Sequence, residues 1–133
     1  MYKKSQLLFH SSVNCPCGSG FVYEECCAPY HEGKKSAPTP LALMRSRYSA
    51  YALGKIDYII ETTHPQTRPK DLMQWKEELI FFSKHTEFIS LEIVEARGDF
   101  VHFKAHVKQE GKPYILEEKS RFVKVEGKWT YWP

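Results

Sequence analysis

Apolar positions in the first half of the chain recur every three or four residues, which is the spacing of one helix face. Thr39 offers an N-cap directly before Pro40, and Gly54 offers a stop signal, so we predict a helix over residues 40–53. Four long side chains share one side of this helix at three- and four-residue spacing. They are Met44, Arg47, Tyr48 and Tyr51.

Two further helices are predicted downstream. The first covers residues 57–63 and ends before Pro65, because the residue preceding a proline is disfavoured in the helical conformation. The second covers residues 71–82, where Asp71 and Gln74 resemble a capping box. Its apolar stripe consists of Leu72, Trp75, Leu79 and Phe82.

Beyond residue 85 the pattern changes from helical spacing to alternation, which is typical of strands. We predict four strands, over residues 88–97, 100–109, 114–125 and 128–132. A glycine lies in each of the three turns between them, at Gly98, Gly111 and Gly127. We expect Ile89, Leu91 and Ile93 to face one way, and the next strand to present Val101, Phe103, Ala105 and Val107. Helices followed by an antiparallel meander predict an α+β fold with the helices on one face of the sheet.

Length and charge exclude some classes of function. The chain has 133 residues, which suits one compact domain plus a small appendage. Its net charge of +3 and the lack of a dense Lys/Arg run give no reason to expect a nucleic-acid partner. No apolar run approaches a membrane span, and the first ten residues hold only three consecutive apolar positions, too few for a signal peptide. We therefore expect a cytoplasmic protein.

All four cysteines fall within thirteen residues, in the spacing C-x-C-x8-C-C. Two close pairs joined by a short loop can bring four sulfurs to one point, as a tetrahedral zinc site requires. A disulfide framework is the main alternative, but a reducing cytoplasm favours metal over disulfides. His31, four residues beyond the last cysteine, is an alternative ligand. The predicted zinc ligands are Cys15, Cys17, Cys26 and Cys27.

Such a zinc ion is expected to be structural. Four thiolates close the coordination sphere and leave no position for a water or substrate. A segment this short buries too little apolar surface to fold unaided, so the metal would supply the folding free energy. Gly18 and Gly20 allow a tight turn round the metal, and the folded knuckle would present Phe21, Val22 and Tyr23 to a partner.

Several stretches along the chain match one protein family. They are Cys15–Ser19, Cys26–Tyr30, Leu43–Tyr48, Thr63–Pro65, and Ser120–Phe122 with Gly127 and Trp129. On these stretches the chain resembles the YchJ family of bacterial proteins. The resemblance implies a SEC-C zinc motif followed by a nuclear transport factor 2-like (NTF2-like, cystatin-like) domain, a strongly curved four-stranded antiparallel sheet wrapped by N-terminal helices. It divides the chain into an N-terminal extension (1–14), the zinc motif and connector (15–38) and the NTF2-like domain (39–133).

The resemblance also implies a role. In the SecA translocase motor the SEC-C motif docks a secretion chaperone and ribosome or lipid surfaces. By analogy we expect an adapter whose zinc knuckle docks a protein partner in protein export or quality control. The alternative is small-molecule binding, or catalysis without a metal, in the cavity of the cone-shaped domain. A homodimer through the open sheet face is a third hypothesis. No known catalytic motif is present, so we do not expect an enzyme.

Polar side chains predicted near the cone cavity are candidates for the alternative function. We expect Arg47 either to lay its stem over the core or to reach Glu118 across the cavity, since a buried charge needs a partner. A strand bulge would place Arg121 inside instead. His64 is expected at a helix end, or at the cavity mouth as an acid or base. Tyr48, Tyr51 and Trp129 complete the candidate set.

Overall fold

The computed structural model describes residues 13–133, so residues 1–12, most of the predicted N-terminal extension, lie outside the described residues. Three main helices precede the sheet: α3 (Pro40–Leu53), α4 (Ile56–Glu61) and α5 (Leu72–Lys84). The sheet contains β1 (Thr86–Arg97), β2 (Phe100–Gln109), β3 (Lys112–Val125) and β4 (Lys128–Trp132). Neighbouring strands are antiparallel in the order β1-β2-β3-β4, and the sheet is not closed. The predicted α+β class is confirmed.

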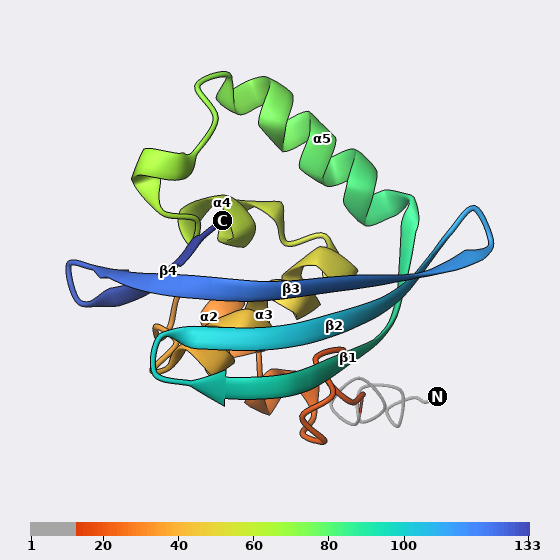
Figure 1. The fold of residues 1–133 in the computed structure, drawn as a ribbon, viewed down its shortest axis with the longest axis horizontal. Helices are drawn as coiled ribbons and strands as arrows, with labels where there is room; N and C mark the ends of the chain where they lie inside the picture. Colours follow the sequence, from red (N-terminus) through yellow and green to blue (C-terminus); the bar gives the residue numbers. More distant parts are fainter. Residues whose placement is uncertain (1–12) are drawn as a thin grey trace, which may run out of the picture.

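The sheet is a long, twisted ribbon, and the helices gather on one side of it. In Figure 1, α3 lies against the sheet, whereas α5 stands away from β3. The turn that leads from α5 into β1 joins this helix to the sheet. The main core forms between α3 and β2, where side chains from both elements are buried. Its largest members are Leu43, Met44, Tyr48, Val101, Phe103 and Phe122.

The boundaries of α3 follow the predicted signals. The Thr39 hydroxyl accepts a hydrogen bond from the Ala42 amide at 3.1 Å, and Gly54 ends the helix in the left-handed conformation with φ 75°. In α5, Asp71 caps the Gln74 amide at 3.0 Å, as predicted. The Gln74 side chain bonds Glu78 rather than turning back, so only half of the capping box forms.

Helix α4 ends two residues earlier than predicted. The Thr62 and Thr63 hydroxyls donate to the carbonyls of Tyr58 and Ile59 at 2.7 and 2.8 Å, which satisfies the last carbonyl groups of the helix. The chain then leaves the helix, and His64 caps a short 3₁₀ turn, η2 (Pro65–Thr67), by accepting from the Gln66 amide. The connector after the last cysteine begins with a short helix, α2 (Ala28–His31), for which the sequence pattern gave no prediction.

The prediction of which β1 side chains face the core was partly wrong. The pairing of β1 with β2 shifts between Phe88 and Ser90, so Ile89 lies in a bulge. As a result Phe88 packs against the core in company with Leu91, whereas Ile89 is 50% exposed. A one-residue bulge reverses the alternation, which the sequence pattern does not reveal. No helix among residues 13–133 is both long and apolar enough to cross a membrane.

Candidate metal centre and cleft

The four cysteine sulfurs converge on one point. The Sγ atoms of Cys15, Cys17, Cys26 and Cys27 all lie within 4.8 Å of one another, and all four thiols are free. Two of the separations, Cys17 to Cys26 and Cys26 to Cys27, are 3.6 and 3.9 Å. A tetrahedron with metal–sulfur bonds of about 2.3 Å has an edge of about 3.8 Å. The sulfurs therefore fit a four-coordinate metal ion.

A small hairpin builds this arrangement. The amide of Cys15 donates to the Phe21 carbonyl at 2.9 Å, and Asn14 forms a bridge with Val22. The turn between them passes through Gly18 and Gly20, whose φ angles of 80° and 92° confirm the predicted tight turn. The chain then makes a 3₁₀ turn, η1 (Tyr23–Glu25), and delivers the second cysteine pair at the start of α2. We call residues 13–31 the knuckle.

Hydrogen bonds around the sulfurs set their protonation. Hydrogen bonds from the Cys15 and Cys27 thiols lower the pKa of Cys17 far below its usual range. The same interaction with Cys17 raises the pKa of Cys15 to about 11. The Ser19 hydroxyl lies 3.1 Å from the Cys26 sulfur and also accepts from the Phe21 amide. One sulfur is thus favoured as a thiolate, and a bound metal would displace the remaining protons.

Polar contacts of Arg45 and His31 attach the knuckle to α3. Arg45 donates from Nη1 to the Cys17 carbonyl at 2.7 Å, although its position beside the apolar stripe of the helix would suggest a solvated side chain. His31 donates from Nε2 to the Ser46 carbonyl and accepts at Nδ1 from the Tyr23 hydroxyl, each at 2.8 Å. Because both ring nitrogens are occupied, His31 serves as a structural link and not as a metal ligand in this arrangement.

Arg47 and Glu118 do not form the predicted ion pair. The buried Arg47 guanidinium donates from Nη1 to Ile59, Thr62 and Thr63 at 2.7–3.2 Å. It lies over the Tyr131 ring, with 4.5 Å to the ring centroid. The Tyr131 hydroxyl in turn donates to Glu118 Oε2 at 2.8 Å, so an aromatic ring separates the two charges.

Burial dominates the electrostatics of this region. Desolvation lowers the pKa of Arg47, because burial disfavours the charged form of the guanidinium. Desolvation also raises the pKa of Tyr131 well above its usual range, with the Glu118 carboxylate as a further cause. The phenol therefore remains protonated and continues to donate to Glu118. Glu118 and Ser120 lie on the core-facing side of β3, since they pair opposite Phe103 and Val101.

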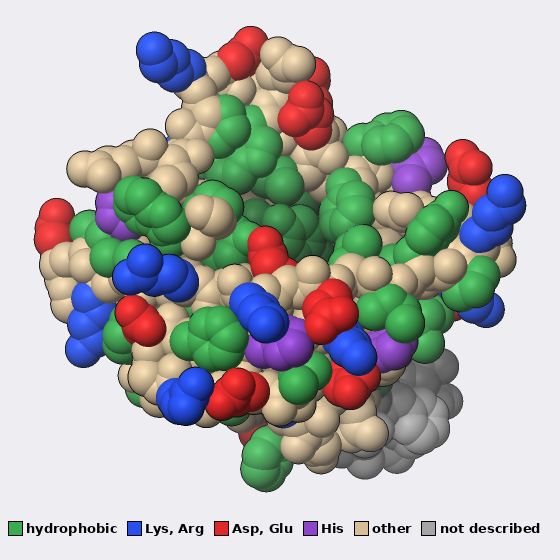
Figure 2. All heavy atoms as spheres, viewed as in Figure 1, with side chains coloured by type: hydrophobic (Ala, Val, Ile, Leu, Met, Phe, Trp, Pro, Cys, Tyr) green, Lys and Arg blue, Asp and Glu red, His purple; other side chains and the backbone are tan. Residues whose placement is uncertain are grey.

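An apolar cleft opens between α5 and β3. Its volume is about 520 Å³, and we call it the α5–β3 cleft. Figure 2 shows hydrophobic side chains lining this hollow. Tyr48 and Tyr51 from the predicted set line it, and Glu118 lies at its rim. Lining residues that the sequence reasoning did not assign to a pocket include Phe82, Phe88, Phe103 and Leu116.

Tyr48 contributes an unusual polar atom to this region. The residue is 3% exposed, and its hydroxyl is the only buried side-chain N or O atom without a hydrogen-bond partner among the described residues. Burial, followed by the charge of Cys17, raises the pKa of Tyr48 to about 12. The phenol is therefore neutral and costs desolvation energy with no compensating bond.

The remaining candidates lie elsewhere. Trp129 lines a second groove, of about 370 Å³, together with Lys35 and Arg68. The His64 ring packs edge-on against Trp132 at 4.6 Å, and Arg121 is exposed on the outer face. Neither His64 nor Arg121 lines the α5–β3 cleft.

The fold and the cysteine site agree with a known protein family. A family model described as the middle NTF2-like domain of YchJ matches residues 39–133. The chain belongs to the YchJ family. A UPF0225 protein of Deinococcus radiodurans is 46% identical over 118 residues, which cover 88% of this chain and 85% of that protein. A UPF0225 protein of Vibrio parahaemolyticus is 39% identical over 124 residues, covering 89% of this chain and 72% of its own length.

Two solved structures of SEC-C motif containing proteins share this architecture. The solution structure of the Rhodopseudomonas palustris protein has a TM-score of 0.78 and 35% identity, covering 91% of this chain and 96% of that chain. The crystal structure of the Psychrobacter arcticus protein has a TM-score of 0.76 and 29% identity, covering 94% and 83%. This YchJ-family chain therefore combines a SEC-C cysteine cluster that can hold a metal ion with an NTF2-like sheet.

Proposed function

We propose that this YchJ-family protein is an interaction adapter whose knuckle is folded by Zn²⁺ and docks a protein partner. Sulfur spacings of 3.6 and 3.9 Å support the zinc assignment, because tetrahedral all-thiolate sites are typical of structural zinc. The ligands would be Cys15, Cys17, Cys26 and Cys27. A cytoplasmic location suits such a site, since thiols stay reduced there.

The metal would act as a structural element. The buried cluster of the knuckle consists of Cys15, Cys17 and Cys27, with Tyr23 and Cys26 packed against it. No larger apolar side chain is buried in that cluster, so the sulfurs themselves form the interior of the knuckle. Zinc bound to them supplies the folding free energy that this short segment lacks. With four thiolates bound, the ion has no open position for a substrate.

The observation that carries the docking proposal is the exposure of Phe21. Its side chain is 64% exposed on the surface of the knuckle, and exposure of an aromatic ring to water is unfavourable. Beside it lies a hollow of about 390 Å³, also lined by Cys26, Tyr30 and Arg45. A protruding aromatic next to a hollow is the arrangement of an interface anchor. The SEC-C resemblance favours a partner in protein export or quality control.

A binding experiment with three variants tests this proposal. Zinc content and capture of a purified secretion chaperone are measured for wild type, Phe21→Ser and Cys26→Ser. We expect Phe21→Ser to retain zinc and lose the chaperone, and Cys26→Ser to lose both. Ile115→Ser removes an equally exposed aliphatic group on β3 and should change neither. Unchanged capture by both knuckle variants would leave zinc with a structural role alone.

A second candidate function is binding of a small organic molecule in the α5–β3 cleft. A cleft of about 520 Å³ with apolar walls and a carboxylate at the rim has the size and composition of ligand sites. Leu116 lines this cleft and is 40% exposed, so Leu116→Trp would fill it without disturbing the core. Small molecules extracted from wild type but not from Leu116→Trp would support the proposal. Identical extracts from both proteins would count against it.

A further inference from the structure

We propose that the α5–β3 cleft selects small organic cations with an apolar body, such as aromatic amines. This inference rests on the second function proposed above and adds the chemical class of the ligand. It follows from the aromatic wall of the cleft, the charged group at its rim and the position of the nearest buried cation.

One wall of the cleft is made of aromatic rings from three elements. Tyr48 and Phe88 pack edge to face at 5.7 Å, as do Tyr51 and Phe82. Phe82 and Phe88 are 5.9 Å apart, which joins the four rings into one surface. Aromatic faces carry negative electrostatic potential and attract cations that lose part of their water. This wall therefore favours a cation over an anion of the same shape.

The rim adds a carboxylate that is already held in place. Glu118 Oε1 accepts from the Ser120 hydroxyl at 2.9 Å, and Oε2 accepts from the Tyr131 hydroxyl at 2.8 Å. Each carboxylate oxygen can accept a further hydrogen bond, so Glu118 retains capacity for an ammonium group. The two donors fix its orientation, which lowers the entropy cost of binding.

Nothing basic lines the cleft to attract an anion. Its charged lining residues are Glu117 and Glu118, and it has no Lys, Arg or His among the described residues. His102 contacts Glu117 at 2.6 Å, so Glu117 already has a partner. The nearest buried cation, Arg47, lies behind the Tyr131 ring and uses Nη1 on backbone and threonine oxygens. A ligand in the cleft therefore meets carboxylate hydrogen-bond acceptors and no basic side chain.

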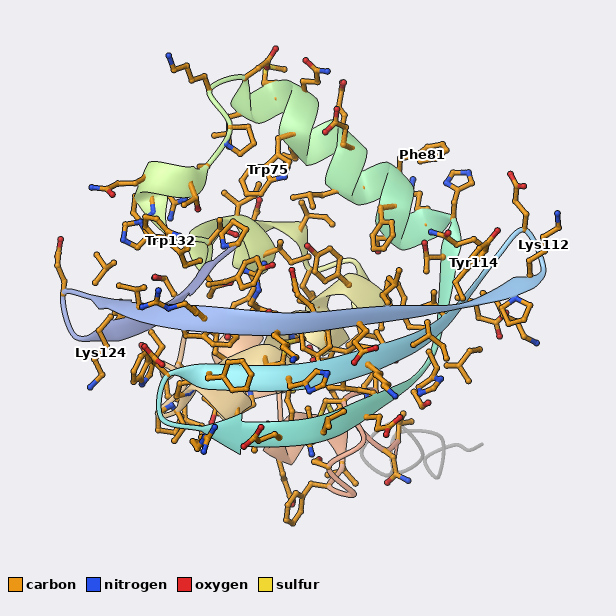
Figure 3. All side chains as sticks on the ribbon, in the orientation of Figure 1. Trp75, Phe81, Lys112, Tyr114, Lys124 and Trp132 are labelled. Carbon is orange, nitrogen blue, oxygen red and sulfur yellow. The ribbon has the colours of Figure 1, made fainter. Side chains whose placement is uncertain are left out.

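The cleft is also open enough to admit such a molecule. Leu116 and Tyr114 on the concave side of β3 are 40% and 48% exposed, and α5 stands apart from this strand. In Figure 3, Tyr114 lies on β3 near the C-terminus of α5, while Phe81 projects from the outer side of that helix. A ligand between α5 and β3 would bury apolar surface that is now exposed to water.

Three probes of matched size test the charge preference. Benzylamine is a cation at pH 7, benzyl alcohol is neutral and benzoate is an anion. Dissociation constants are measured from amide shifts in NMR titrations of the zinc-loaded full chain. We expect benzylamine to bind at the cleft at least fivefold more tightly than benzyl alcohol, and benzoate to bind least.

Two matched variants test whether Glu118 causes the preference for the cation. Glu118→Gln keeps the shape of the side chain and should remove most of the preference for benzylamine over benzyl alcohol, leaving the smaller part that the aromatic wall supplies. Glu92→Gln makes the same charge change at a residue that pairs with His106 and does not line the cleft, and should keep the fivefold preference. Amide spectra of both variants report whether the fold is retained.

The possible failures are distinguishable. If benzoate or benzyl alcohol binds at the cleft as tightly as benzylamine, the cleft binds small molecules and the cationic class is wrong. If Glu118→Gln keeps the full preference in a folded protein, the assigned carboxylate is wrong. If no probe gives saturable shifts at the cleft, small-molecule binding itself is contradicted. None of these results affects the docking role of the knuckle.

Discussion

The knuckle and the α5–β3 cleft satisfy their polar groups in opposite ways. In the knuckle, four sulfurs face one point, and both nitrogens of His31 are hydrogen bonded. In the NTF2-like domain, the cleft stays open, Glu118 sits at its rim, and the buried Tyr48 hydroxyl lacks a partner. The knuckle is complete once a metal is bound, whereas the cleft retains groups that a ligand can use.

Under the proposed roles, this difference separates metal-dependent folding of the knuckle from small-molecule binding in the sheet domain. A closed thiolate shell supplies folding free energy and leaves no position for chemistry at the metal. An open apolar cleft does the reverse, because its exposed surface lowers stability and offers a binding site. A small-molecule ligand is therefore expected in the sheet domain, whereas the metal is expected to act as a structural element of the knuckle.

The largest effect is expected from breaking the metal site. Cys27→Ser should abolish zinc binding and unfold the knuckle, since structural zinc contributes on the order of 10 kcal/mol to local folding. The sheet should persist, because every buried residue of its main core lies outside the knuckle. Metal analysis combined with amide NMR measures both outcomes. Collapse of the sheet signals together with the knuckle would show that the two regions do not fold independently.

The second effect concerns the buried cation of the domain. Arg47→Met removes charged hydrogen bonds to Ile59, Thr62 and Thr63, and we expect a loss of about 3 kcal/mol of unfolding free energy. Relief of the desolvation cost of Arg47 offsets part of this loss. Urea denaturation provides the measurement. Arg45→Met is the control and should weaken only the contact with the knuckle. An Arg47→Met protein as stable as wild type would show that desolvation cancels the bonds.

Local signals explain how much the sequence could predict. The cap at Thr39, the stop at Gly54 and the four strands followed from neighbouring residues, and the structure has all of them. The cysteine cluster was also accessible, because all its members lie within thirteen residues. Long-range geometry was not accessible in the same way. The Tyr131 ring between Arg47 and Glu118 depends on where β4 meets the segment after α4.

The bulge at Ile89 shows a second limit. Alternation predicted Ile89 on the core side, and a single extra residue in β1 turned it outward and placed Phe88 in the cleft wall. No residue type demands a bulge at this point, so the pattern alone could not reveal it. For that reason Phe88 was missed as part of the aromatic wall, whereas Tyr48 and Tyr51 were predicted near the cavity and Phe82 was assigned to the apolar stripe of its helix.

The third effect appears at alkaline pH. Burial raises the pKa of Tyr48 and of Tyr58 to about 12. The unfolded phenols ionise near pH 10, so between pH 10 and 12 the unfolded chain releases protons that the folded protein keeps. The contribution is fully present below pH 10 and is lost as pH rises toward 12, by roughly 2 kcal/mol for each residue.

Denaturation of the zinc-loaded protein at several pH values measures this loss, and phenolate absorbance reports the ionisation. Zinc-bound thiolates are already deprotonated and do not contribute over this range. The expected result is that Tyr48, Tyr58 and Tyr131 ionise at a higher pH than the exposed phenols. Ionisation of every tyrosine near pH 10 in protein that is still folded would contradict the assigned burial.

The smallest expected effect tests the contrast between the knuckle and the cleft region. It compares two tyrosines, of which only one has a hydrogen bond at its hydroxyl. The Tyr48 hydroxyl is buried without a partner, whereas the Tyr58 hydroxyl lies 2.7 Å from Ser46 Oγ. Tyr48→Phe should therefore raise the unfolding free energy by about 1 kcal/mol, and Tyr58→Phe should lower it by a similar amount. Thermal and urea denaturation of both variants supply the values. Opposite signs would confirm that the sheet domain carries an unmet polar group that the closed knuckle does not. Equal destabilisation would mean that the Tyr48 hydroxyl is bonded in solution, and the contrast between the two regions would then rest on the open cleft alone.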